Sequence, residues 1–256
     1  MTFFSKFFSY IYQIVLEAIF PLTASERALL SVSIYNMWKL FPRAPHSSIP
    51  EACSVFAYKN KQVSTLVWSL KYKKSAHATK IGGYALYEIL KTFMNAATYD
   101  GVGNRQTLQI LLVPIPISKR RRRERGFNQC DLLIDEIRRI HLGRTQISDL
   151  NRNLGQNLNK NLLFSKKLLV RTHHNSRQTL KDRRERLEGA QKIFSANLME
   201  LDQIRIKLNI IGSNSGKNYL ILVIDDVVTT GSTMREAVQT LRDAGLTNTY
   251  GLALAH

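Results

Sequence analysis

The sequence has little cysteine and little proline, and it has no uninterrupted apolar run of membrane-spanning length. Its two cysteines, Cys53 and Cys130, lie far apart and form no Cys-x-x-Cys pair. This excludes a cysteine zinc site and a disulfide framework, and a reducing, cytoplasmic setting is the simplest expectation. The 6 prolines, 13 glycines and 44% hydrophobic residues are typical of a globular chain rather than a disordered one.

Acidic residues are also scarce. Asp and Glu number 19 against 37 Lys and Arg, and the net charge is +18. A charge of this size indicates an anionic partner, such as a nucleic acid, a phosphorylated metabolite or an anionic membrane. The charge alone does not choose among these partners, and a general effect on solubility explains it equally well.

The first twenty residues are apolar, with large side chains at helical spacing. The uncharged stretch within them, residues 7–16, is shorter than the ~20 residues that span a bilayer, so we predict no stable membrane span. The pattern favours an amphipathic helix packed on the body of the chain or on a partner subunit, as in a homo-oligomer. Peripheral contact with a membrane is the alternative.

Apolar periodicity and turn residues predict the other elements. We expect helices over residues 25–40, 62–71, 78–94, 128–141, 180–187 and 233–244, and strands over 55–58, 108–113, 168–170, 204–211, 220–224 and 249–254. Residues 99–107 read as a loop. Strands alternating with helices after residue 108 predict an α/β fold with a parallel sheet. Residues 1–50 then form an N-terminal helical segment with a proline linker, and residues 51–256 form the main domain. Within that domain, residues 51–107 form a hood-like helical part and residues 108–256 the core sheet.

The most informative segment is residues 220–233, LILVIDDVVTTGST. An apolar strand runs into Asp225 and Asp226, and a hydroxyl-rich turn then leads into a helix. Backbone N–H groups of such a turn can bind an anion, whereas two carboxylates suit neutral hydroxyls or a metal. The segment therefore predicts a ligand with a phosphate beside a diol, such as a ribose 5-phosphate. The alternative is a simple helix cap, which needs only one such residue.

This segment resembles the phosphoribosyl-pyrophosphate (PRPP) motif of type I phosphoribosyltransferases. The resemblance implies that fold, a parallel sheet flanked by helices, with Asp225 and Asp226 holding the ribose hydroxyls as the catalytic pair. It also implies a 5′-phosphate site made by Val228, Thr229, Thr230, Gly231, Ser232 and Thr233. Mg²⁺ is expected to arrive with PRPP, without direct protein ligands, and to reach the two acids through water.

A second group of candidate residues follows the strand predicted over 108–113. Pro114, Ile115 and Pro116 precede residues 119–125, KRRRRER, which we expect to form a basic loop. Ligands of open α/β sheets bind outside the carboxyl ends of the strands, so this loop should face the same crevice as the two acids. Arginine can bind phosphate with two parallel donors. The candidates for pyrophosphate binding are Pro114, Ile115, Pro116, Arg122, Arg123 and Arg125. A solvated basic loop is the alternative.

The wider pattern resembles the ComF family of competence-associated, phosphoribosyltransferase-like proteins. The matching segments are VPIP at 113–116, RGFNQ at 125–129, WSLKYK at 68–73, and the spacing of Arg171, Gln178, Arg186 and Phe194. The chain departs from that family in lacking an N-terminal four-cysteine zinc knuckle and in having Gly189 where asparagine is usual. The resemblance implies a role in handling DNA taken up during transformation, or in nucleotide salvage. Candidates for substrate or DNA contact are Lys71, Tyr72, Asn128, Gln129, Arg171, Gln178 and Arg186.

Two functions remain open at this point. One is Mg²⁺-dependent phosphoribosyl transfer from PRPP to a nucleobase or amine. The other is a non-catalytic module that binds PRPP or a nucleotide and holds single-stranded DNA on its basic surface, alone or with a partner from the competence machinery. Tyr58, Trp68 and Tyr72 are candidates for base stacking, although core packing is favoured for Trp68. Cys130, at a predicted helix start, has either a lowered pKa or the role of a small buried apolar residue.

Overall fold

The computed structural model describes residues 22–45, 50–95, 98–99, 105–106, 108–150, 161–172, 192–210 and 218–256. Four predictions lie outside these ranges: the N-terminal amphipathic helix, the charged helix over 180–187, and the positions of Gln178 and Arg186. Gly189 also lies outside them.

The centre of the molecule is a five-stranded parallel sheet with the order β1-β9-β8-β4-β5. Its strands are β1 (Ala52–Phe56), β9 (Thr249–Ala255), β8 (Tyr219–Val227), β4 (Gln109–Pro114) and β5 (Leu162–Phe164). The predicted parallel α/β sheet flanked by helices is confirmed, and it agrees with a type I phosphoribosyltransferase-like fold. β8 contributes side chains to the cores on both faces of the sheet, which explains why its sequence is a continuous apolar run.

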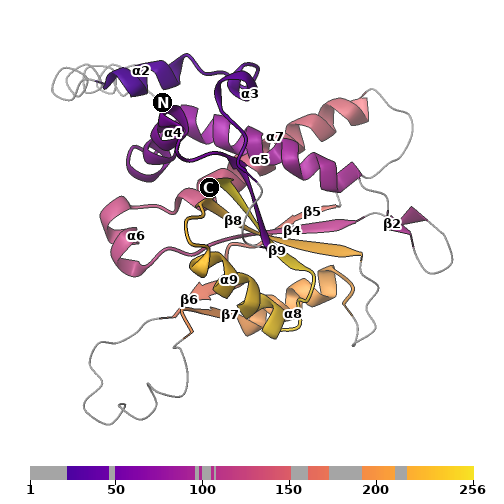
Figure 1. Cartoon of the computed structure of the whole chain (residues 1–256). Helices are drawn as coiled ribbons and strands as arrows, with labels where there is room; N and C mark the ends of the chain where they lie inside the picture. The colour runs from indigo at the N-terminus through magenta and orange to yellow at the C-terminus, as the bar shows by residue number, and fades with distance from the viewer. Residues whose placement is uncertain are drawn as a thin grey trace, which may run out of the picture.

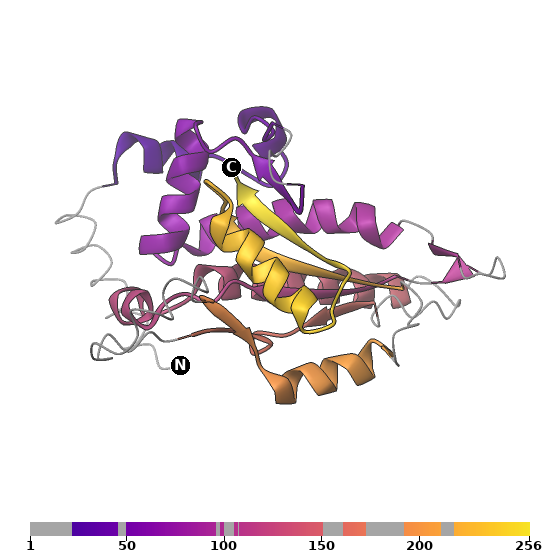
Figure 2. The same ribbon diagram turned by 60° about the horizontal axis from the view of Figure 1, so that its bottom comes forward.

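Helices cover both faces of the sheet (Figures 1 and 2). α4 (Lys61–Tyr72), α5 (Ala76–Asn95) and α7 (Gln129–Leu150) pack on one face, and α8 (Leu198–Lys207) and α9 (Ser232–Asp243) on the other. Successive strand residues alternate between the two cores. In β8, for example, Leu222 belongs to the first core and Ile221 to the second. Both faces of the sheet are thus closed to solvent, and its strand ends are left to form a site.

The N-terminal segment differs from its prediction. The helix expected over residues 25–40 is wrong as one element, because α2 (Ala24–Leu30) and α3 (Met37–Leu40) are separated by a turn. In that turn the Asn36 side chain accepts a hydrogen bond from the Ser33 backbone N–H at 2.7 Å. Phe41 then packs edge-on against Phe56 with ring centroids 5.1 Å apart. The expected extended linker is present where Arg43 bridges to Phe56.

The strand predicted over residues 204–211 is wrong, since residues 204–207 belong to α8 and a turn follows them. The Asn197 side chain accepts a hydrogen bond from the Glu200 N–H at the helix start, and Leu201, Ile204 and Leu208 are buried at helical spacing. The alternating Ile204, Ile206, Leu208 and Ile210 pattern had suggested a strand. The helix forms because Asn197 caps its start and because residues three to four positions apart are buried on one face.

Two small antiparallel pairs complete the described structure. β2 (Thr98–Tyr99) pairs with β3 (Arg105–Gln106) where a loop was expected, and β6 (Leu169–Arg171) pairs with β7 (Phe194–Ala196). Among the described residues, none of the helices has both the length and the apolar content required to cross a membrane.

Candidate functional site

The carboxyl ends of β4 and β8 open onto one cavity of about 490 Å³. Two segments that are far apart in the sequence line it, residues 115–118 after β4 and residues 225–234 at the end of β8 and after it. Lys71, Arg121, Gln129 and Arg171 complete the lining. The expectation that the two strand ends face one crevice is confirmed, because neighbouring parallel strands end at the same edge of a sheet.

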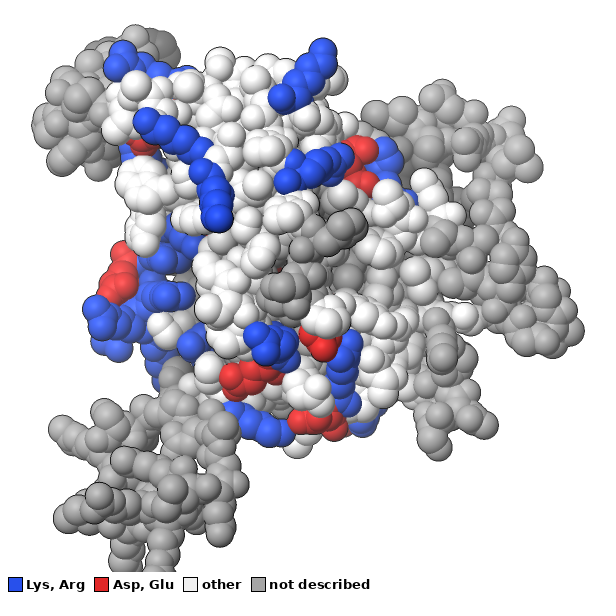
Figure 3. All heavy atoms as spheres, viewed as in Figure 1, with Lys and Arg blue, Asp and Glu red and all other residues white. Residues whose placement is uncertain are grey.

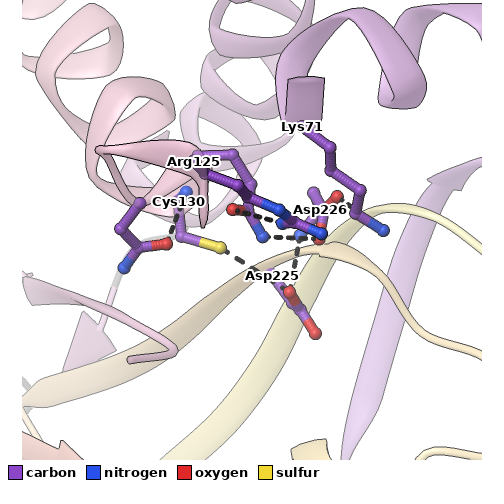
Figure 4. A network of polar contacts seen from close by, with 7 residues as sticks. Lys71, Arg125, Cys130, Asp225 and Asp226 are labelled. Atoms are coloured by element: carbon purple, nitrogen blue, oxygen red, sulfur yellow. Dashed lines mark hydrogen bonds and ion pairs between the residues drawn. The ribbon is translucent and has the colours of Figure 1, made fainter. Parts of the chain in front are cut away.

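Asp226 lies at the inner end of the cavity, with its side chain only 3% exposed. Lys71 Nζ from α4 is 3.0 Å from its Oδ2, and Gln129 Nε2 from α7 donates to its Oδ1 at 3.3 Å. Figure 4 shows the Lys71 side chain reaching down from its helix to the Asp226 carboxylate. Within the described residues Oδ2 accepts no hydrogen bond of good geometry. Its charge is instead balanced by the Lys71 ammonium group, which lies against this oxygen.

Asp225 is partly buried beside Asp226 and has different partners. Its Oδ1 accepts the Asp226 backbone N–H at 2.8 Å and the Cys130 thiol at 3.6 Å. Burial raises the pKa of Asp225 well above its usual value, and the neighbouring Asp226 charge raises it further. Lys71 thus compensates Asp226, while Asp225 retains its proton more readily than an ordinary aspartate.

Cys130 lies fully buried at the start of α7. Burial, followed by the charges of Asp225 and Asp226, raises the pKa of its thiol well above the usual value. The prediction of a lowered pKa for Cys130 is therefore wrong, and the alternative, that Cys130 is a small buried residue, is confirmed. As a neutral S–H group, Cys130 serves as a weak donor to Asp225.

The turn between β8 and α9 leads into the N-terminus of a helix, the part of a helix whose backbone N–H groups are available to an anion. Gly231 has φ +77°, a left-handed conformation that glycine adopts without strain, and it occupies the position before α9. Glycine has no capping side chain, so no side chain satisfies the first N–H groups of α9. Val228 donates its N–H to Ala255 O, and Arg235 donates to Thr230 O, which fixes the turn from both ends. All six residues predicted for phosphate binding, 228–233, line the cavity.

Residues 119–125 are a helix, α6 (Lys119–Arg125), so the predicted basic loop is wrong. Ser118 caps it by accepting the Arg121 N–H at 3.2 Å, and Gly126 ends it with φ +78°. The helix distributes its cations around its axis. Only Arg121 from α6 is among the described lining residues of the cavity, and the prediction had omitted it. The Ser118 cap was a sequence signal for the helix, but not for which of its arginines faces the cavity.

The three predicted arginines lie elsewhere. Arg122 approaches Asp131 at 3.6 Å, Arg125 stacks over Tyr72 and donates to Gln129, and Arg123 is exposed. In Figure 3, Lys and Arg side chains gather along the edge of the molecule where α6 lies.

The other predicted residues divide in the same way. Ile115, Pro116, Lys71, Gln129 and Arg171 line the cavity. Pro114 pairs with Ile224 inside the sheet and is not a lining residue. Asn128 is buried and ties α7 to the end of β4, because its Nδ2 donates to Ile115 O at 3.0 Å and its Oδ1 accepts the Cys130 N–H. Tyr72 is exposed just outside the lining.

Comparison with protein-family models and with curated proteins found no match for this chain. Any family assignment therefore depends on the motifs and on the geometry described above.

Proposed function

We propose that this chain is a PRPP-binding protein of the ComF type, with a type I phosphoribosyltransferase-like site, which acts in the cytoplasm in DNA uptake or nucleotide salvage. The observation that supports this best is the meeting, in one cavity, of a buried acid pair and a backbone anion site. A ribose 5-phosphate has a diol and a phosphate that match these two parts of the cavity.

The proposed ligand pose follows from the charges. The 5′-phosphate binds the N–H groups at the start of α9, where the helix dipole favours an anion. The ribose hydroxyls donate hydrogen bonds to the carboxylates of Asp225 and Asp226, which both line the cavity. The pyrophosphate lies against the end of β4, where Arg121 and Arg171 supply positive charge.

The acid pair is suited to a water-bridged Mg²⁺ rather than to a directly bound one. Cys130, Asp225 and Asp226 place one ligand atom each within 4.8 Å of one another, but this set includes a thiol. Mg²⁺ takes oxygen ligands in an octahedron and usually keeps several waters. Mg²⁺ bound to PRPP would neutralise part of the negative charge of the pyrophosphate.

The chemistry proposed for this site is glycosyl transfer at ribose C1. The bond from C1 to the pyrophosphate oxygen breaks, a bond from C1 to an acceptor nitrogen forms, and the acceptor N–H proton passes to the released pyrophosphate or to water. The chain contributes orientation of the ring through Asp225 and Asp226 and cationic stabilisation of the departing group through Arg121 and Arg171.

Calorimetry with PRPP and Mg²⁺ tests the proposal. We expect binding that needs Mg²⁺ and that is lost in the double variant Asp225→Asn, Asp226→Asn. The matched control is Asp202→Asn, which removes a well-exposed acid on α8. Undiminished binding by the double variant contradicts the proposed site. A screen of nucleobases and amines for pyrophosphate release then separates transfer from binding alone.

A second candidate function, the holding of single-stranded DNA, is favoured by the exposed cations of α6. Lys119, Arg120 and Arg123 project from the helix and lie outside the cavity lining. Binding through such cations should weaken steeply as salt rises, and replacing all three with Gln should reduce the slope of that dependence. Absence of oligonucleotide binding even at low salt contradicts this function without affecting the PRPP site.

A further inference from the structure

Two aromatic rings are exposed beside the cavity. Trp68 is 44% exposed and Tyr72 58% exposed, so the core packing favoured for Trp68 from the sequence is wrong. They lie one turn apart on α4, with ring centroids 5.7 Å apart and planes inclined by 42°. Exposed single aromatics are common, but two in mutual contact form an apolar surface that a planar ligand can cover.

Cations flank both rings. Lys73 Nζ lies 5.2 Å from the Trp68 centroid, and the Arg125 guanidinium lies 4.9 Å from the Tyr72 centroid. A guanidinium is planar and weakly hydrated, so it can pair with an aromatic ring and also present its own face to a second planar group. Such a surface selects ligands that combine a ring with negative charge.

Two chains of contacts join this surface to the acid pair. Lys71, the residue before Tyr72, makes the ion pair with Asp226. Arg125 Nη1 donates to Gln129 Oε1 at 3.2 Å, and Gln129 in turn donates to Asp226. In the last turn of α4, Lys71 therefore contacts the proposed ribose site, and the next residue, Tyr72, has an exposed ring. Figure 4 shows Lys71 and Arg125 approaching Asp226 together.

We propose that Trp68, Tyr72 and Arg125 form a stacking subsite for a nucleobase attached to, or about to be attached to, the ribose in the cavity. This inference rests on the proposed function, and it narrows the acceptor from any amine to a planar nitrogen heterocycle. The phosphate and ribose of a nucleoside 5′-monophosphate bind at α9 and the acid pair, and its base stacks on Tyr72. The subsite should accept any of the nucleobases, since every base has a flat face that can stack.

The test compares ligands that differ only in the base. Ribose 5-phosphate, AMP and UMP are titrated by calorimetry into the full chain. The variant Trp38→Phe leaves Trp68 as the single tryptophan, so quenching of its fluorescence reports stacking directly. Phenylalanine keeps an aromatic ring where Trp38 packs against Phe56. We expect AMP and UMP to bind more tightly than ribose 5-phosphate and to quench Trp68.

The decisive variant is Tyr72→Leu, which keeps apolar volume but removes the ring. It should weaken AMP and UMP binding by about 5- to 150-fold, the range for loss of a stacking partner, and leave ribose 5-phosphate binding unchanged. Tyr35→Leu, which replaces a tyrosine that is 86% exposed between α2 and α3, is the matched control.

Equal binding of AMP and ribose 5-phosphate, with Tyr72→Leu neutral toward both, overturns the subsite and leaves the proposed function intact. Failure of ribose 5-phosphate and PRPP to bind at all overturns both. If Tyr72→Leu weakens an oligothymidylate but not UMP, the rings serve single-stranded nucleic acid and the proposal is wrong.

Discussion

The ends of β8 and β4 meet in the cavity, but the charged side chains are buried at the first and exposed to solvent beyond the second. At the end of β8 the acids lie among apolar residues, and a single cation, Lys71, faces the nearly buried Asp226. Beyond the end of β4 the cations of α6 stand mostly in solvent. Buried charges need a specific partner, because desolvation costs several kcal/mol per ion, whereas exposed charges do not. The β8 end should therefore be sensitive to every substitution, and the β4 end only to the residue that faces the ligand.

The largest effect is expected for Lys71→Met. It leaves Asp226 buried without its cation, which should cost about 3–5 kcal/mol of folding stability. The additional change Asp226→Asn should restore much of that loss. Lys192→Met, which breaks an exposed pair with Asp243, should leave the folding stability nearly unchanged. Urea unfolding measures all of these variants, and similar losses for Lys71→Met and Lys192→Met would remove the contrast between buried and exposed charge.

Two neighbouring arginines sharpen the comparison at the β4 end. Arg121 lines the cavity and Arg123 does not. Arg121→Gln should weaken PRPP binding about tenfold or more, as expected for loss of a charge-assisted hydrogen bond. Arg123→Gln should leave it nearly unchanged. Calorimetry with Mg²⁺ decides, and equal losses would mean that α6 acts through its total charge rather than through one side chain.

The same substitution at two glycines tests whether the phosphate turn depends on its backbone. Gly231→Ala forces a side chain into a left-handed conformation and should cost about 1–2 kcal/mol of stability, with weaker phosphate binding. Gly143→Ala, in α7, adds a Cβ with nothing within 4 Å and should stabilise by about 0.5–1 kcal/mol. Chemical denaturation measures both, and a neutral Gly231→Ala would contradict the role given to its conformation.

The smallest effect is a pH dependence from Asp225, whose pKa is raised in the folded protein by burial and by Asp226. Below its ordinary pKa the group is protonated in both states and costs nothing. As pH rises from that value through the folded-state pKa, the unfolded chain releases the proton first, so stability falls. The variant Asp225→Asn lacks this loss. Its Tm advantage over the natural chain should therefore grow as the pH rises above about 4, and a constant difference would contradict the raised pKa.

The sequence by itself determined the β8 end. A continuous apolar run specified a strand buried on both faces, and the order of two acids, a glycine and hydroxyl residues specified the turn before α9. These features are local, since the binding groups are backbone N–H groups and adjacent side chains. The alternation of strands and helices along the sequence also predicted the parallel sheet, because each helix returns the chain to the edge where the next strand begins.

Only the tertiary structure decided which more distant side chains join that turn. The phase of α6 brings Arg121 rather than Arg122, Arg123 or Arg125 into the cavity lining. The packing of α4 pairs Lys71 with Asp226 and leaves Trp68 exposed, and the packing of α7 buries Cys130 against Asp225. Each of these outcomes depends on contacts between residues far apart in the chain. Periodicity predicts that a helix forms, but not which of its faces a distant carboxylate will meet.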